Sequence, residues 1–283
     1  MTPAVGHRIE QELSARIRSV RPLAGGCVAD VQRLELSDGR SVVAKLAAAP
    51  GGSLDLEAWM LRYLAERSSL PVPRVLLGEP SVLVLEYIEH DGRGDAALHA
   101  AEVLAALHSI EADSFGLDRD TLIGSLPQPN PRTERWLDFF REHRLMHFGR
   151  AAVTKGRLDV DVLHRLERLA ARLEQWLPEV SRPSLIHGDV WGGNVLVNDG
   201  RVAAFVDPAI YYADAEIELA FTTLFATFSS AFYRRYDELR PIRAGFFEER
   251  CPLYNLYPLL VHTILFGGSY ARSVESTVRR FVG

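Results

Sequence analysis

The sequence predicts an α+β protein of two lobes, a small lobe built on an antiparallel sheet and a larger, mainly helical lobe. Two observations lead to this prediction. The chain has 283 residues, of which 47% are hydrophobic and 24% charged, so it can bury one large core or two smaller ones. Its hydrophobic pattern also changes near residue 88, because short alternating segments precede this point and helical periodicity follows it. We therefore expect the lobes at 1–87 and 88–283.

The elements of the first lobe follow from turn residues and periodicity. An amphipathic helix is expected at about 4–17. The stretch 22–46 then indicates a strand, a Gly-rich turn, a strand, a tight turn at SDGR and a third strand. A second helix is expected at about 54–67, and two further strands at 74–77 and 82–88. This alternation predicts a small sheet accompanied by helices.

The second lobe has helical periodicity over most of its length, as in 95–110 and 159–177. The main exception is a predicted hairpin at 195–206, in which the Asn-Asp-Gly turn separates two apolar strands. A hairpin returns the chain to its starting point, so Asn194 and Asp207 should lie side by side at its open end. Asp189 precedes them on the same loop. Polar residues at hairpin ends are common, so this set alone only suggests a site.

The composition excludes several classes of protein. A net charge of -5 without a Lys/Arg-rich run argues against a nucleic-acid partner. The apolar runs are too short or too interrupted to cross a bilayer, and the N-terminus lacks an apolar signal region, so we expect a cytoplasmic protein without a membrane partner. Its 2 cysteines, Cys27 and Cys251, cannot form a disulfide framework or an ordinary metal cluster, which fits a reducing compartment.

Two glycines in the first lobe are candidates for a contact with phosphate. Gly25 and Gly26 would let the backbone approach a bulky anion and point its N–H groups at the anion. A Gly-Gly pair between strands is more often a simple turn, and that alternative stays open for the pair taken alone.

Lys45 is a candidate phosphate ligand, because it lies near the end of the third strand. A lysine there could also be a solvated edge charge. Glu57 lies on an otherwise apolar face of the helix that follows, where an unpaired acid is costly. A Lys45–Glu57 ion pair is therefore a reasonable hypothesis, with solvation of both groups as the alternative.

Together these features resemble the protein-kinase-like plan, in which a Gly-rich loop, a strand lysine and a helix glutamate hold ATP above a catalytic loop. His187, Gly188 and Asp189 are followed by Asn194 at the spacing of the kinase pattern H-R-D-x-x-x-x-N, with Gly in place of Arg. Asp207 begins DPA where protein kinases have DFG. These two differences point to small-molecule kinases related to aminoglycoside phosphotransferases.

One family is more similar than the others. The segments that resemble the fructosamine kinase (ketosamine-3-kinase) family are LIHGDVWGGNVLV, FVDPAIYYADAEIELAFTTLF, LIGSLPQPN, WLDFFREHRL and PLYNLYPLLVHTILFGGSY. The resemblance extends from LAGGC nearly to the C-terminus. The Trp after HGD, the DPA and the LFGG segment make it specific.

The resemblance implies ATP and Mg²⁺ as cofactors and a role for each matching residue. Asp189 would be the catalytic base, and Asn194 and Asp207 would hold Mg²⁺. Lys45 would contact the phosphates and Glu57 would fix it. The remaining nucleotide contacts would be the loop glycines Gly25 and Gly26 and the connector residues Glu86, Tyr87 and Ile88, whose backbone would bind adenine. Residues 1–87 would thus bind the nucleotide, and 88–283 would carry the catalytic loop and the acceptor site.

The implied activity is ATP-dependent phosphorylation of a sugar hydroxyl, at the third carbon, of ketosamines such as ribulosamine or fructosamine adducts. The adducts could be small molecules or glycated proteins, and phosphorylation would make them labile, which implies deglycation repair. One alternative is an aminoglycoside or other amino-alcohol phosphotransferase. Another is a nucleotide-binding regulatory module without turnover, although a base beside two metal ligands argues against a module that does no chemistry.

The sequence also allows expectations for His187, Trp191 and the two cysteines. His187 is expected to pack and form hydrogen bonds, since phosphoryl transfer needs only one base. Trp191 could belong to the core or form a wall against the sugar substrate. Cys27, next to the Gly-rich loop, could be an oxidisable thiolate or a small residue chosen for fit. Cys251 is expected to be buried, so a disulfide would join two chains through Cys27, and we expect a monomer or a redox-dependent dimer.

Overall fold

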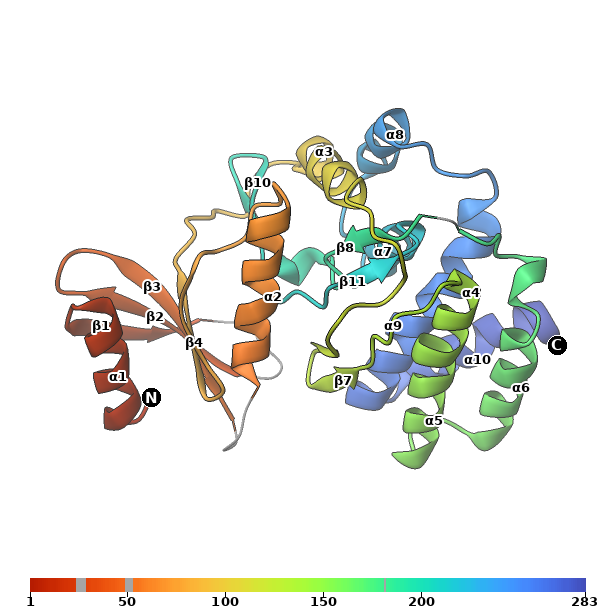
Figure 1. The fold of residues 1–283 in the computed structure, drawn as a ribbon, viewed down its shortest axis with the longest axis horizontal. Helices are drawn as coiled ribbons and strands as arrows, with labels where there is room; N and C mark the ends of the chain where they lie inside the picture. The colour runs from red at the N-terminus through yellow and green to blue at the C-terminus, as the bar shows by residue number, and fades with distance from the viewer. Residues whose placement is uncertain (24–28, 49–52, 181) are drawn as a thin grey trace.

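We describe the protein from a computed structural model, whose described residues are 1–23, 29–48, 53–180 and 182–283. They form two lobes that lie side by side, with the N-terminus on the smaller lobe and the C-terminus at the far end of the larger one (Figure 1). The smaller lobe contains a 5-stranded antiparallel sheet, and the larger one is mainly helical. The predicted two-lobed α+β fold is therefore confirmed.

The sheet of the smaller lobe has the strand order β1-β2-β3-β5-β4. Its elements are α1 (Pro3–Leu13), β1 (Ile17–Pro22), β2 (Ala29–Leu36), β3 (Ser41–Ala47), α2 (Leu54–Arg67), β4 (Val75–Glu79) and β5 (Val82–Glu86). One face of the sheet packs on α1, where Ile9 lies in a cluster with Leu34 and Val84. The other face packs under α2, where Leu61 meets Leu83. Because successive side chains of a strand point to opposite faces, each face of the sheet contributes to its own apolar cluster.

The first helix is shorter than the sequence predicted. Instead of continuing to about residue 17, α1 ends at Leu13, and Ser14 adopts a left-handed conformation with φ 51°. Ile17 already belongs to β1, where it pairs with Leu36. The apolar residue that extended the helical pattern is therefore the first residue of the sheet.

The larger lobe is built around a long buried helix, α9 (Cys251–Phe266), which packs against α5 (His147–Thr154), α7 (Glu216–Leu224) and α10 (Ser269–Val282). Its first elements are α3 (Ala97–His108), β6 (Thr121–Ile123), β7 (Leu126–Gln128), α4 (Trp136–Phe139), the π-helix η1 (Phe140–Met146), α5 (His147–Thr154), α6 (Val160–Ala170) and the 3-10 turn η2 (Leu173–Gln175). They are followed by β8 (Ser184–Ile186), the 3-10 turn η3 (Gly192–Asn194), β9 (Val195–Asn198), β10 (Arg201–Phe205), β11 (Tyr211–Ala213), α7 (Glu216–Leu224), α8 (Ser230–Leu239), the π-helix η4 (Phe246–Arg250), α9 (Cys251–Phe266) and α10 (Ser269–Val282). The helix predicted over 159–177 ends at Ala170.

The predicted hairpin is confirmed as β9 and β10, and it forms hydrogen bonds with residues 91–93, which follow the connector. The N–H groups of Asp91 and Gly92 both donate to the carbonyl of Val197, at 3.1 and 2.9 Å. The N–H of Gly200 in the hairpin turn donates to the carbonyl of Arg93 at 2.8 Å. A Cβ on Gly94 would lie 2.6 Å from the Cα of Gly200, so this close approach requires glycine. The segment 91–94 therefore holds the hairpin in place.

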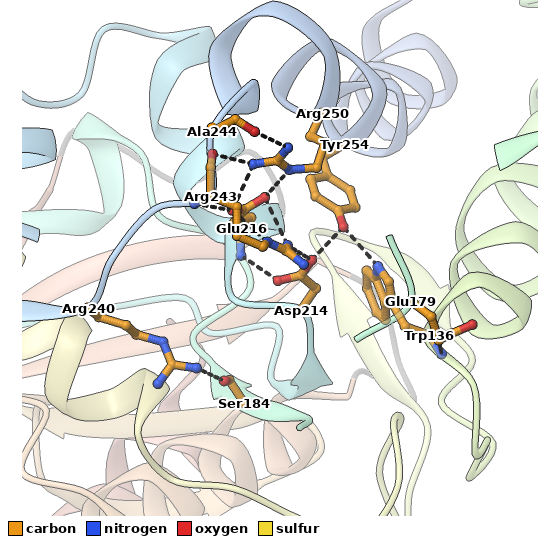
Figure 2. A network of polar contacts seen from close by, with 10 residues as sticks. All are labelled: Trp136, Glu179, Ser184, Asp214, Glu216, Arg240, Arg243, Ala244, Arg250 and Tyr254. Atoms are coloured by element: carbon orange, nitrogen blue, oxygen red, sulfur yellow. Dashed lines mark hydrogen bonds and ion pairs between the residues drawn. The ribbon is translucent and has the colours of Figure 1, made fainter. Parts of the chain in front are cut away.

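A buried ionic network fixes the segment that follows the hairpin (Figure 2). Glu216 accepts hydrogen bonds from Arg250 Nε at 2.6 Å and from Arg243 Nε at 3.0 Å. Asp214 pairs with Arg243 and also accepts a hydrogen bond from the Tyr254 hydroxyl at 2.6 Å. Removing one partner would leave a buried charge uncompensated. The network therefore holds the start of α7 against η4 and α9.

None of the described helices combines the length and the apolarity that crossing a membrane requires. Cys251 is buried, as expected, and burial raises the pKa of its thiol.

Candidate active site

The predicted catalytic loop begins after β8 and ends in the turn that precedes β9. Its aspartate is partly buried, and Asn194 Nδ2 donates to Asp189 Oδ2 at 2.8 Å and to the Asp189 carbonyl at 2.9 Å. Burial raises the pKa of the Asp189 carboxyl to about 7, although the hydrogen bond from Asn194 acts in the opposite direction. A carboxyl that is held in one orientation and titrates near neutrality suits a group that accepts a proton during a reaction.

Gly188 explains why an arginine cannot stand at this position of the loop. Its φ is +87°, and a Cβ built on it would lie 2.1 Å from the carbonyl oxygen of Ala209. The N–H of Ala209 donates to the carbonyl of His187 at 2.8 Å. The loop and the DPA segment therefore touch through their backbones, and only glycine permits this contact.

The buried carboxylate of Glu218, which was not predicted from the sequence, forms hydrogen bonds with the backbone of the loop. Glu218 on α7 accepts hydrogen bonds from the N–H groups of Gly188 at 2.6 Å and His187 at 3.3 Å, and from His108 Nε2 at 2.8 Å. Burial alone would raise the pKa of Glu218, but the hydrogen bond from His108 and the loop N–H groups hold it below its usual value. The signal that could have revealed it was an acid inside the apolar run of α7.

The position of His187 agrees with the expected packing role. Its ring is fully buried at 5.7 Å from the ring of Phe205, between ring centroids. Burial lowers the pKa of His187 to about 4, so the imidazole is neutral at pH 7.

At the open end of the hairpin, Val195 pairs with Phe205, and the N–H of Val206 donates to the carbonyl of Asn194 at 3.0 Å. Asp207 follows directly with φ 55°, and its carboxylate is paired with Lys45. The hairpin thus brings residue 207 next to the end of the catalytic loop.

The Lys45–Glu57 ion pair predicted from the sequence is confirmed, with Nζ and Oε1 2.7 Å apart and both side chains largely buried. Lys45 therefore bridges a carboxylate of the smaller lobe and Asp207 of the larger one. A buried cation between two acids is a natural contact point for phosphate, which could replace one of the two carboxylates.

We predict that Glu57→Gln raises the KM for ATP about fivefold to tenfold and lowers turnover less, because Lys45 loses the charged group that fixes it. Steady-state kinetics with varied ATP tests this expectation. Glu12→Gln is the matched control, since Glu12 pairs with Arg8 on an exposed helix face and should leave the kinetics unchanged. Equal KM values for the Glu57 variant and the wild type would contradict the assignment.

A cavity of about 1100 Å³ connects these groups. Its lining includes Lys45, Glu57, Asp189, Trp191, Asn194 and Asp207, together with Glu86, Tyr87 and Ile88 of the connector. The N–H of Glu86 already donates to the carbonyl of Arg74 at 2.9 Å, so this group does not serve a ligand. The predicted phosphate glycines Gly25 and Gly26, and Cys27 beside them, lie outside the described residues.

Trp191 does not belong to the core, because its side chain is exposed and lines the cavity. A Cβ on Gly193 would lie 2.3 Å from the indole, so glycine at this position lets the ring fold back over its own loop. The Trp-Gly-Gly sequence therefore shapes one wall of the cavity beside Asp189.

The available oxygen atoms fit Mg²⁺ that is shared with a nucleotide. Asn194 uses its Nδ2 for Asp189, which leaves the amide oxygen for a metal, and Asp207 offers a carboxylate. Among the described residues no group of three or more His, Cys, Asp or Glu side chains is placed to hold a metal ion. Mg²⁺ commonly binds one or two side-chain oxygens and completes its shell with phosphate and water. The pair thus suits a metal that arrives with ATP.

Comparison with known proteins gives consistent results. A family model described as fructosamine kinase matches residues 1–283. A Synechocystis sp. protein named as a probable ketoamine kinase is 34% identical over 292 residues, covering 99% of this chain and 97% of that protein. A solved structure from Thermobifida fusca, assigned as a fructosamine-3-kinase, superposes with a TM-score of 0.88 at 30% identity and covers 99% of this chain and 98% of that one.

More distant structures share the fold alone. An aminoglycoside phosphotransferase in complex with gentamicin has a TM-score of 0.67 at 14% identity, with 99% of this chain and 96% of that one covered. A macrolide 2'-phosphotransferase has a TM-score of 0.62 at 15% identity, with 98% of each chain covered. The two-lobed architecture is therefore that of protein-kinase-like phosphotransferases.

Proposed function

Because this chain belongs to the fructosamine kinase family and is a kinase, we propose that it transfers the γ-phosphoryl group of ATP to the hydroxyl on the third carbon of ketosamines. Ribulosamine and fructosamine adducts are the substrates we expect, either as small molecules or on glycated proteins. The observation that carries the proposal is the Asp189–Asn194 hydrogen bond at 2.8 Å in the cavity that also contains Lys45 and Asp207.

Asp189 is proposed to orient the attacking hydroxyl and to accept its proton. Its carboxylate has one oxygen engaged by Asn194 Nδ2, so the other oxygen is available to the substrate. Glu218 holds the backbone N–H groups on the N-terminal side of Asp189, which fixes the loop without contact to the reacting atoms. Orientation of this kind is the main contribution that a kinase makes to phosphoryl transfer.

Lys45 is proposed to contact the phosphates, with Glu57 keeping its ammonium group in place. Asn194 and Asp207 would hold Mg²⁺ when it is bound, and the metal would neutralise negative charge on the phosphates. The connector at Tyr87 and Ile88 would offer backbone groups to adenine, and the Arg33 guanidinium lies 3.9 Å from the centroid of the Tyr87 ring, which fixes that side chain.

The proposed biological role is repair of glycated amines. A phosphate on the third carbon is a good leaving group next to the carbonyl carbon of the adduct. Once the adduct enolises between its first and second carbons, inorganic phosphate is eliminated, and water hydrolyses the resulting imine to a dicarbonyl sugar and the free amine. This role follows from the chemistry of the product.

An ATP-consumption screen over ribulosamines, fructosamines and aminoglycosides tests the proposed activity. We expect turnover with at least one ketosamine and none with kanamycin. Phosphorylation of kanamycin without ketosamine turnover would instead indicate an amino-alcohol phosphotransferase, and ATP binding without any turnover would indicate a regulatory module.

A further inference from the structure

One end of the cavity is formed mainly by aromatic rings. We call this part the aromatic end and define it by Trp191, Phe225, His262, Phe266 and Tyr270, all of which line the cavity. The rings form a chain of neighbours, with centroids 5.8 Å apart for Trp191 and Phe225, 5.2 Å for Phe225 and His262, and 5.0 Å for His262 and Tyr270. The chain of rings starts 2 positions after Asp189 on the catalytic loop.

Several of these rings are unusually exposed. The exposed fractions are 38% for Trp191, 36% for Phe225 and 48% for Phe266. Large apolar side chains that are exposed together and line a cavity indicate a binding surface. The proposed activity uses none of them except Trp191, so most of this surface has no assigned role.

His262 has a defined tautomer within this end. Its Nδ1 lies 2.7 Å from the carbonyl oxygen of Pro258, one turn earlier on α9. A carbonyl oxygen only accepts, so Nδ1 carries the proton and Nε2 presents a lone pair in the neutral ring. Burial lowers the pKa of His262, which keeps the ring neutral at pH 7.

His262 Nε2 is free to accept a hydrogen bond from a ligand. None of the described residues donates a hydrogen bond to Nε2, and Nε2 is not among their fully buried unpartnered atoms. His262 is also one of the residues that line the cavity. The aromatic end therefore offers two hydrogen-bond acceptors among its ring faces, His262 Nε2 and the hydroxyl of Tyr270, and only Nε2 is an acceptor that cannot also donate.

The acids that line the described part of the cavity are engaged elsewhere. Glu57 and Asp207 pair with Lys45, and Glu218 accepts from the loop N–H groups. Asp189 has one oxygen held by Asn194 and the other assigned to the attacking hydroxyl, and Glu86 belongs to the connector. A polycationic acceptor would need free carboxylates, so the chemistry of the aromatic end suits a ligand with one cationic centre.

We propose that the aromatic end binds the secondary ammonium group of the ketosamine, which donates an N–H to His262 Nε2 while the surrounding rings face its positive charge. This inference rests on the proposed function and identifies a specificity determinant for it. Aromatic faces attract an ammonium ion, and Nε2 of a neutral imidazole accepts a hydrogen bond from its N–H while the proton stays on the more basic amine.

The geometry of the substrate agrees with this placement. Only three carbon atoms separate the nitrogen of a ketosamine from the hydroxyl oxygen on its third carbon, so the two groups bind close together. Trp191 is close to Asp189 in the same loop and is the first ring of the aromatic end. We infer that a hydroxyl bound at Asp189 places the ammonium group beside the rings that begin with Trp191, and that the amine substituent extends over the exposed side chains of Phe225 and Phe266.

A comparison of two substrates that differ at one atom tests the proposal. The first is the N-benzyl ketosamine of the preferred sugar, and the second is its 1-O-benzyl ether, which has neither the charge nor the N–H. The wild type should prefer the amine, and His262→Phe should lower kcat/KM for the amine about tenfold or more, mainly through KM. For the ether, the same variant should change kcat/KM about twofold or less. If the ether is not turned over, its inhibition constant should change about twofold or less.

Two further variants separate the hydrogen bond from packing. His262→Gln restores an acceptor and should recover part of the loss for the amine. His164→Phe, on the exposed face of α6, is the matched control and should leave both substrates unchanged. Equal losses for amine and ether in His262→Phe, or no loss for either, would overturn the inference while the proposed function stands. A wild type that phosphorylates no ketosamine would overturn both.

Discussion

Asp189→Asn is expected to lower turnover about 10²- to 10⁴-fold while Mg·ATP binding stays nearly unchanged. The substitution keeps the shape of the side chain but removes the carboxylate that accepts the proton of the hydroxyl. Single-turnover kinetics measures the chemical step, and calorimetric titration with ATP in the presence and absence of Mg²⁺ measures binding.

Asp207→Ala is the matched comparison, because it removes a proposed metal ligand and leaves the base intact. This variant should lose the metal-dependent part of nucleotide binding as well as turnover. Equal, modest losses in both variants, with turnover largely retained, would show that the two carboxylates do not have the separate roles assigned to them.

Gly188→Ala is expected to lower the free energy of unfolding by about 3 kcal/mol or more. The alanine would have to adopt the left-handed conformation of this position, φ +87°, which strains any residue with a Cβ. Its Cβ would also lie 2.1 Å from the Ala209 carbonyl oxygen, so the loop and the DPA segment would have to separate. Urea unfolding measures the change, and turnover should fall in the same variant because Asp189 is the next residue.

Gly156→Ala separates the conformational cost from the clash. Gly156 also has a positive φ, +65°, but a Cβ there would meet nothing within 4 Å. This control should cost only about 1 kcal/mol. Equal destabilisation by the two substitutions would show that the contact with Ala209 contributes nothing.

Local sequence signals predicted much of the fold. The Asn-Asp-Gly turn and its flanking apolar runs specified the hairpin, and the helix predicted at about 54–67 matches α2 at Leu54–Arg67. Glu57 on its apolar face made the pair with Lys45 predictable, because a buried acid needs a partner. These features depend on residues that lie close together in the sequence, so a single sequence is enough to predict them.

The remaining features depend on contacts between distant segments. Glu218 lies about 30 positions from the loop that it supports, and the contact between Gly188 and Ala209 arises only when two segments fold together. His262 reaches the cavity because one side of α9 lines it, while its neighbours on the helix are apolar like those of a core residue. Periodicity cannot distinguish a residue that faces a cavity from one that faces the core, since both lie on a buried face.

The most direct test of the central claim is the structure of the product. The protein should be incubated with ATP, Mg²⁺ and a ribulosamine or fructosamine, and the product analysed by mass spectrometry and by phosphorus–carbon couplings in NMR. We predict one added phosphate, bonded to the oxygen of the third sugar carbon, followed by release of the free amine. A phosphate on another hydroxyl, or an unmodified ketosamine beside a phosphorylated aminoglycoside, would contradict the account.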